Sequence, residues 1–253
     1  MSPRAPRAHA SLRELAQQRR LPAHQPMDHV TLEWIVSNRP ANFDAAPSFP
    51  RPGLMLVPPS SWFTRQDLAT DSNHGVRHNA RVSLLASLLA QEYRLDAHDT
   101  AAACAAGAVH DCRRRNDRDD PGHGQRAATF LLANADAVTN ALGRPLPQEA
   151  LHRAATAIAL HDVPYEQFTD RQQRAYQASP LLVDVLKAAD CLDRYRLPLQ
   201  RWWPDTSRLR RRPPPWAPAA ACAFVTRSER ARLDGTANAH ALHHAHQTLT
   251  RGL

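Results

Sequence analysis

The sequence predicts an all-α fold, on the evidence of its composition and its hydrophobic periodicity. Of its 253 residues, 43% are hydrophobic and 6% are aromatic, and only eight are glycine. Alanine and leucine dominate the middle of the chain while β-branched runs are scarce, and this mixture favours helices over strands. Apolar residues also recur at helical spacing in long segments. The length is enough for one sizeable hydrophobic core.

Two short helices are expected before the main bundle. Ser11-Leu12-Arg13-Glu14 has the pattern of a capping box and would open a helix that reaches about Arg20. Asp28 is a suitable cap for a second helix over 29–37. Six prolines then follow between residues 38 and 61. They predict an extended, semi-rigid connector that either wraps the core or acts as a lid.

The main helical bundle is predicted between about residues 72 and 197. The segment 100–110 is small and apolar throughout, which indicates a helix buried at the centre of the bundle. Several other helices are opened by a proline or by a capping residue, because both suit the first helical turn. Helices are expected over 79–95, 100–110, 121–142, 147–161, 180–197 and 226–248.

These elements divide the chain into an N-terminal extension (1–61), a helical domain (62–200) and a C-terminal part (201–253) with a loop and a helix packed on the core. The loop, 201–218, interleaves tryptophan and arginine, a composition that can stack bases and contact backbone phosphates. We favour a solvated loop whose tryptophans anchor it to the core. The last helix carries four histidines, interpreted as a solvated face: His240, His243, His244 and His246.

The net charge is +8 and the sequence pI is about 10.1. Such a balance favours an anionic partner, whether a phosphate ester, a nucleotide, a nucleic acid or an acidic protein. GC-rich coding sequence would produce the same balance, since Lys187 is the only lysine and every other cation is arginine. Both interpretations stay open at this point.

We expect a cytoplasmic protein without disulfides. No apolar stretch reaches the length of about 18 residues that a membrane span needs. Residues 1–10 are basic and lack the apolar core of a secretory signal. The four cysteines (Cys104, Cys112, Cys191 and Cys222) form no Cys-x-x-Cys pair, and Cys104 and Cys191 lie among alanines and leucines as small buried residues do.

His110-Asp111 is the pair that most strongly suggests chemistry. It ends the apolar run 101–109 and precedes a stretch dense in arginine and aspartate. An imidazole and a carboxylate side by side at the end of a buried helix are suitable metal ligands. The carboxylate can also bridge two ions.

Further histidines and aspartates lie where such a site would recruit them. His123 belongs to the first turn of an expected helix, His161 ends another, and Asp190 lies in the middle of a third. His74 and His78 are four residues apart and share a face if their helix begins by His74. This nitrogen and oxygen mixture suits one or two divalent ions such as Mn²⁺, Fe²⁺, Co²⁺, Zn²⁺ or Mg²⁺. A bound divalent ion lowers the pKa of water and neutralises phosphoryl oxygens, so hydrolysis of a phosphoester or phosphoanhydride is the predicted reaction.

Four motifs in residues 72–197, roughly half of the chain, resemble the HD-domain metal-dependent phosphohydrolases, whose fold is an all-α bundle. They are His78-x-x-Arg81-Val82, Ala108-Val109-His110-Asp111, Asp119-x-x-x-His123-Gly124 and Lys187-Ala188-Ala189-Asp190. The resemblance implies a minimal metal site of His78, His110, Asp111 and Asp190, with His110 and Asp111 as the catalytic pair. His123 and His161 match the added ligands of members with two metals, and His74 matches an additional ligand of some members.

The chain also departs from two branches of that superfamily. Cys112-Arg113-Arg114 follows the His-Asp pair where nucleotide-alarmone hydrolases carry an acidic signature, which argues against that activity. The Gly-Tyr-Pro signature of cyclic-dinucleotide phosphodiesterases is absent as well.

Five cationic residues are candidates for substrate contact: Arg81, Arg114, Arg118, Lys187 and Arg194. Arg114 and Arg118 follow the His-Asp pair directly. Lys187, Asp190 and Arg194 share one helix face, which gives either a salt-bridge ladder or a ligand flanked by phosphate-binding cations. Asp193 is expected to point away from the metal and to brace arginines.

A phosphohydrolase acting on a nucleotide or a small phosphorylated metabolite is therefore the leading hypothesis. One alternative is a binuclear-iron oxygenase on the same scaffold. The other is a nucleic-acid-binding or regulatory protein with a structural metal site, which would bind RNA or DNA in a salt-sensitive manner.

Overall fold

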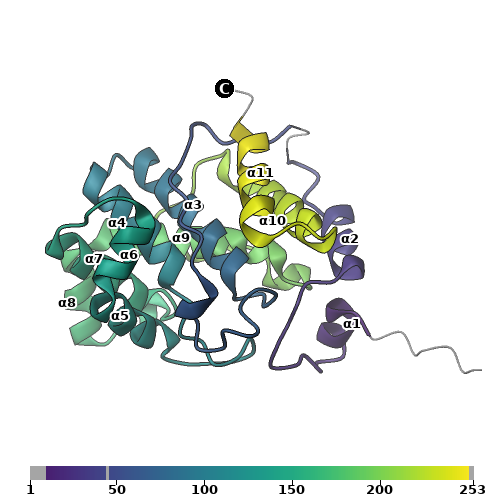
Figure 1. Ribbon diagram of the computed structural model, residues 1–253, viewed down its shortest axis with the longest axis horizontal. Coiled ribbons are helices and arrows are strands. Elements are labelled where there is room, and N and C mark those ends of the chain that lie inside the picture. The colour runs from purple at the N-terminus through teal and green to yellow at the C-terminus, as the bar shows by residue number, and fades with distance from the viewer. Residues whose placement is uncertain (1–9, 44–45, 251–253) are drawn as a thin grey trace, which may run out of the picture.

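The computed structural model describes residues 10–43 and 46–250, and it is built from helices (Figure 1). Apart from one isolated bridge between Pro26 and Ser72, this part of the chain holds no β-structure. The α-helices are α1 (Leu12–Gln17), α2 (His29–Ser37), α3 (Val76–Glu92), α4 (Ala97–Val109), α5 (His123–Ala133), α6 (Ala135–Leu142), α7 (Gln148–Leu160), α8 (Asp170–Ala178), α9 (Pro180–Asp193), α10 (Ala217–Leu233) and α11 (Asn238–Thr250). Single 3₁₀ turns lie at Ser60–Trp62, Tyr165–Gln167, Arg194–Arg196, Gln200–Trp202 and Thr206–Arg208. The predicted all-α fold is confirmed.

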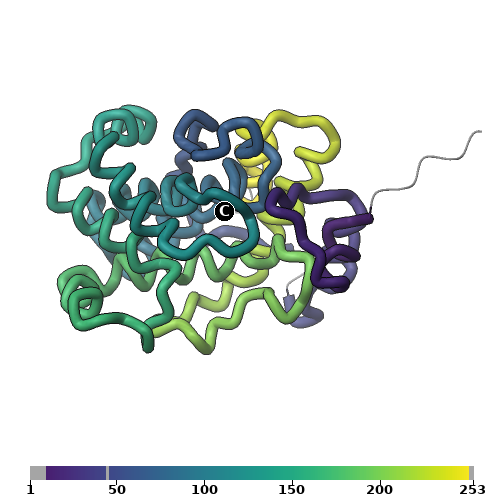
Figure 2. Tube along the Cα trace, turned by 90° about the horizontal axis from the view of Figure 1, so that it is seen from below, coloured from purple at the N-terminus to yellow at the C-terminus, as the bar shows by residue number. Residues whose placement is uncertain are grey.

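The helices α3, α4, α7 and α9 form the centre of the molecule. Every residue of α4 from Thr100 onward is buried, as the small apolar run predicts. The helices α5 to α8 lie at one end, and the purple N-terminal helices lie at the other end beside α10 and α11 (Figures 1 and 2). No helix in the described part of the chain has the length and apolar character needed to cross a membrane.

The central helices α3 and α4 approach each other closely at Gly107. A Cβ atom on Gly107 would lie 2.6 Å from the backbone nitrogen of Ser83 and 2.7 Å from its Cα. Both contacts are to backbone, so relief requires the two helices to separate. The small side chains of α4 are therefore what places the end of this helix, with His110-Asp111, against α3.

Gly107→Ala is expected to destabilise the protein by about 2 kcal/mol, because overpacking outweighs the gain in helix propensity of about 1 kcal/mol. Gly143→Ala is the control: Gly143 has a φ of 72°, but a Cβ added there would meet no heavy atom within 4 Å, so only backbone strain is added. Thermal and urea unfolding measure both. Equal stability of Gly107→Ala and the wild type would show that the two helices do not need this close approach.

Several helix boundaries differ from those predicted. The segment 121–142 is two helices, and α5 begins at His123 after Gly122, whose φ is 75°. Asp120, which precedes Pro121 and was expected to cap this helix, does not do so, because its carboxylate pairs with Arg126 and accepts the Arg115 N–H. The predicted single helix over 226–248 is wrong: α10 and α11 are separated by a turn in which Gly235 has a φ of 96°.

Residues 46–61 of the proline-rich connector pack on the core. Phe49 is fully buried, and its N–H donates to the Leu249 carbonyl. Further along, the Leu56 N–H donates to Ser83 Oγ on α3. The two predicted N-terminal caps are also present: Ser11 and Glu14 form a reciprocal capping box, and Asp28 accepts the Thr31 N–H.

The Trp- and Arg-rich loop lies against the core. Trp203 is buried, with its ring 5.4 Å from that of Trp34. The guanidinium of Arg210 lies 4.4 Å above the ring of Tyr165, and that of Arg211 lies 4.9 Å above Tyr93. These aromatic rings and arginines thus contact each other, and they do not form a common surface on which nucleic-acid bases could stack.

Candidate metal centre

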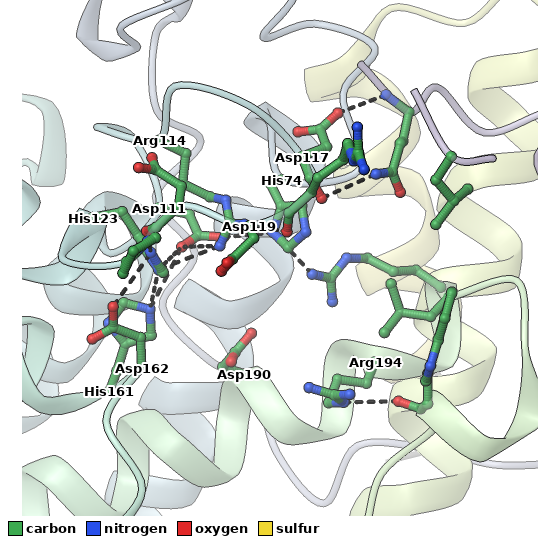
Figure 3. A pocket seen from close by; sticks show the side chains of 18 of the residues that line it. His74, Asp111, Arg114, Asp117, Asp119, His123, His161, Asp162, Asp190 and Arg194 are labelled. Carbon is green, nitrogen blue, oxygen red and sulfur yellow. Dashed lines mark hydrogen bonds and ion pairs between the residues drawn. The ribbon is translucent and has the colours of Figure 1, made fainter. Parts of the chain in front are cut away.

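Six predicted ligands come together where several helices end or begin. His78 lies in the first turn of α3, His123 begins α5, and Asp190 lies on α9. His110 and His161 are the residues that follow the last turns of α4 and α7. Figure 3 shows Asp111, His123, His161 and Asp190 directed into one cavity. The topology thus collects ligands that are far apart in the sequence.

One part of the cluster is formed by His78, His110 and Asp190. The Nε2 atoms of His78 and His110 are 3.0 Å apart. Asp190 Oδ1 lies 3.5 Å from His78 Nε2 and 3.8 Å from His110 Nε2. The Oδ2 atom of Asp111 adds a fourth oxygen or nitrogen donor, 3.4 Å from His78 Nε2. These atoms are spaced as the ligands of one metal ion are.

The second part is formed by His123 and His161. Their Nε2 atoms are 3.1 Å apart, and Asp111 Oδ1 lies 2.9 Å from His123 Nε2 and 3.5 Å from His161 Nε2. Asp111 therefore offers one carboxylate oxygen to each part of the cluster. Such an arrangement would allow this carboxylate to bridge two ions.

Each of the four rings donates its Nδ1 proton to an acceptor and turns Nε2 toward the centre. A hydrogen bond to the other ring nitrogen is how proteins orient histidine ligands. The acceptors are Asp193 Oδ2 for His78, Gly107 O for His110, Asp120 O for His123 and Ile158 O for His161, at 2.7 to 2.8 Å. Two neutral imidazoles with facing Nε2 atoms repel each other unless a proton or a metal ion lies between them.

The position of Asp111 Oδ1 is suited to a cation. Asp111 is buried, and this oxygen makes no well-aligned hydrogen bond among the described residues, while His123 Nε2 lies 2.9 Å from it. A buried carboxylate oxygen needs a partner: a protonated His123 supplies one without a metal, and a divalent ion would take the place of that proton. The residues present therefore fit a divalent metal ion.

The charges of the cluster agree with this fit. Burial opposes ionisation of Asp111, but Arg114 and the surrounding histidines hold the pKa of that carboxyl well below its usual range. Burial lowers the pKa of His110 to about 3, so this ring is neutral, as a ligand must be. Burial also opposes the charge on His123, yet the adjacent Asp111 carboxylate raises its pKa to about 9. A metal ion at this position would replace the His123 proton.

His74 reaches the cluster by a different route from the one predicted. The helix α3 begins at Val76, so His74 precedes it and shares no helix face with His78. Its Nδ1 nevertheless lies 2.7 Å from Asp111 Oδ2, and Arg196 Nη2 lies 3.3 Å from the same nitrogen. His74, His78 and Asp111 thus form a further group with metal-ligand spacing.

The structure brings three of the five predicted substrate contacts to the cavity. Arg114, Arg118 and Arg194 line it. Arg114 Nη1 lies 3.4 Å from His123 Nε2 and 3.9 Å from Asp111 Oδ1, which places a guanidinium directly beside the candidate metal ligands.

Arg81 and Lys187 are placed elsewhere. Arg81 is buried between Asp193 and Glu229, at 2.6 and 2.7 Å. Lys187 Nζ donates to the carbonyls of His161 and Val163, at 3.0 and 2.5 Å. The lysine therefore holds the backbone of a candidate ligand instead of facing the cavity.

Sequence reasoning missed what Asp193 and Asp162 do. Asp193 braces Arg81 and Arg196, as predicted, but it also accepts the Nδ1 proton of His78. Asp162 Oδ2 lies 3.3 Å from His123 Nδ1. The adjacency of Asp162 to His161 was visible in the sequence, whereas the pairing of Asp193 with His78 crosses 115 positions.

Five candidate ligands line a cavity of about 880 Å³: His74, Asp111, His123, His161 and Asp190. Figure 3 shows their side chains around it. Its walls carry the metal cluster, the loop that follows Asp111, the N-terminal segment and the residues after α9. Six arginines line it, with Trp202 at one wall: Arg19, Arg114, Arg118, Arg194, Arg196 and Arg201. Six aspartates line it as well, among them the candidate ligands Asp111 and Asp190. The volume suits a small molecule, and the arginines suit an anion.

The fold and the site together define an all-α protein with a candidate metal centre built from histidine and carboxylate side chains. Comparisons with protein-family models, with curated proteins and with solved structures found no match. The function is therefore inferred from the geometry of the cluster and from the chemistry of the cavity around it.

Proposed function

We propose that the protein is a divalent-metal-dependent phosphohydrolase that cleaves a phosphoester or phosphoanhydride of a nucleotide or of another small phosphorylated metabolite. The observation that carries this proposal is the convergence of four oriented Nε2 atoms on Asp111, whose two oxygens face different histidine pairs. The motifs that resemble HD-domain phosphohydrolases support it as well, because they contain the same residues.

His78, His110, Asp111 and Asp190 would hold one ion, and Asp111, His123 and His161 would hold a second. A bound divalent ion supplies an activated water near neutral pH and neutralises charge on phosphoryl oxygens. The hydrogen bonds at Nδ1 keep each ring in the orientation that ligation needs, without rearrangement.

Arg114 would bind the phosphoryl group that reacts. Its guanidinium lies at the cavity side of Asp111 and His123, and it also donates to the carbonyls of Asn116 and Arg118. These two bonds fix the loop and the guanidinium together. Arginine donates bidentate, charge-assisted hydrogen bonds to phosphate, so this cation can orient the anion beside the ligands.

Metal removal tests the proposal. Purified protein is expected to contain one or two equivalents of a divalent metal by elemental analysis and to release phosphate from members of a phosphorylated-metabolite panel. Chelation should abolish this release, and adding back Mn²⁺, Co²⁺ or Zn²⁺ should restore it. Asp119→Ala, which changes an exposed acid of the cavity wall, is the control and should retain metal.

Two results would contradict the proposal. One is protein that neither contains nor binds a divalent metal while remaining folded. The other is protein that contains iron with the spectroscopic signal of a coupled pair and releases no phosphate from the panel, which would favour the oxygenase alternative.

A further inference from the structure

Three arginines in the cavity wall have no carboxylate partner. Arg19, Arg194 and Arg201 line the cavity, and none of them forms an ion pair with any residue that the structure describes. Arg194 donates only to the Trp202 carbonyl, at 2.8 Å, and Arg201 lies over the ring of Trp202. Their positive charges are thus available to a ligand.

A fourth arginine of this wall, Arg196, is buried and already faces a carboxylate. It is 2% exposed, its Nε donates to the Asn73 carbonyl at 2.8 Å, and its Nη1 lies 3.5 Å from Asp193 Oδ2. Its Nη2 lies 3.3 Å from His74 Nδ1, so this guanidinium adds positive charge beside the candidate ligands. The wall is therefore suited to an anionic group beyond the one that Arg114 binds.

The N-terminal segment that carries Arg19 is fixed to the core. Gln25 N–H donates to Asp117 Oδ2 at 2.7 Å, and Asp117 N–H donates to the Ala23 carbonyl at 2.7 Å. On the other side of Arg19, Arg13 donates to the Pro198 carbonyl and covers the ring of Trp34. Arg19 thus lies between two stretches of the N-terminal segment that contact the core. This segment contributes no candidate metal ligand.

We propose that Arg19 is a substrate-binding residue that holds a second anionic group of the substrate. The substrate class would be small molecules with two separate anionic groups, such as bisphosphates: one group is hydrolysed beside Arg114, and the other is held by the wall to which Arg19, Arg194, Arg196 and Arg201 contribute. This inference rests on the proposed function for the identity of the reacting group.

The backbone of Arg19 is left-handed, and Arg94 has the same conformation, so the two residues allow a matched pair of variants. Arg19 follows α1 with a φ of 57°, and the next N–H, that of Arg20, donates to the Leu15 carbonyl. Arg94 follows α3 with a φ of 59°, and the N–H of Leu95 donates to the Ala90 carbonyl in the same way. Glycine is the preferred residue at such a position after a helix. Arg94 does not line the cavity.

Arg19→Gly and Arg94→Gly are therefore matched variants. Both remove one arginine, both lower the net charge by one, and both relieve a left-handed residue, so neither should lower the midpoint of thermal unfolding. The measurement is isothermal titration of fructose 6-phosphate and fructose 1,6-bisphosphate into the metal-free protein, with each variant beside the wild type.

The wild type is expected to prefer the bisphosphate over the monophosphate. Arg19→Gly should reduce this preference by about fivefold, the effect of one partly exposed charge-assisted contact, whereas Arg94→Gly should leave it unchanged. Equal preferences in the two variants, or no preference in the wild type, would overturn the inference. The proposed function fails on a different result, absence of bound metal and of phosphate release, so the two failures are distinguishable.

Discussion

Asp111→Asn is expected to lower the rate of phosphate release by more than about 100-fold. Replacing a residue that only hydrogen-bonds to a metal ligand already lowers activity by about 10- to 100-fold, and Asp111 is itself a proposed ligand. Asparagine keeps the shape of the side chain but offers one neutral oxygen where aspartate offers two charged ones. Asp111 is the residue whose two oxygens face the two histidine pairs, so the variant should also lose metal content. Elemental analysis and a phosphate-release assay measure the two effects.

The control for this variant is Asp136→Asn, which makes the same chemical change at an exposed position on α6, away from the cavity. It should keep both metal and activity. Circular dichroism should show that both variants are folded. Wild-type metal content and activity in Asp111→Asn would refute the assignment of this residue as the bridging ligand.

Asp193→Asn is expected to produce the second large effect, on stability and on metal affinity together. The Asp193 carboxylate is fully buried and receives His78 Nδ1, Arg81 Nε and Arg81 Nη2. Removing its charge leaves a buried guanidinium with one partner fewer, which costs about 3 kcal/mol. The weaker hold on His78 should lower metal affinity by about tenfold or more.

Glu229→Gln separates these two effects. Glu229 is buried and pairs with Arg77 and Arg81, but it does not touch His78. This variant should lose a similar amount of stability in urea unfolding and keep the metal affinity of the wild type. Equal losses of metal affinity in the two variants would show that Asp193 acts through stability alone and does not position His78.

Much of the candidate site could be predicted because its residue types and their positions at helix ends are recognisable in short stretches of the sequence. A carboxylate next to a histidine at the end of an apolar helix, and histidines at the ends of other helices, are visible in the chain itself. The structure explains the pattern: His110, His123 and His161 each donate to the carbonyl three residues earlier, at a helix end or beginning. Such short-range bonds need no knowledge of the fold.

The contacts of Lys187 and Arg81 could not be predicted in the same way. Lys187 shares a face of α9 with Asp190, which is what its spacing indicates, but the loop after α7 lies where a substrate phosphate was expected. Arg81 meets Glu229 of α10, a helix whose extent the sequence pattern also misjudged. Both outcomes depend on which helix packs beside which.

The sequence by itself determined that this protein is helical and that histidine and aspartate side chains form its candidate metal site, because periodicity, small-residue runs and helix-end residues act over a few positions. Only the tertiary structure decided that Asp111 faces two histidine pairs, that Asp193 holds His78, and that Arg19 of the N-terminal segment lines the cavity. These relations join residues distant in the chain, and they arise from packing, which no local pattern records.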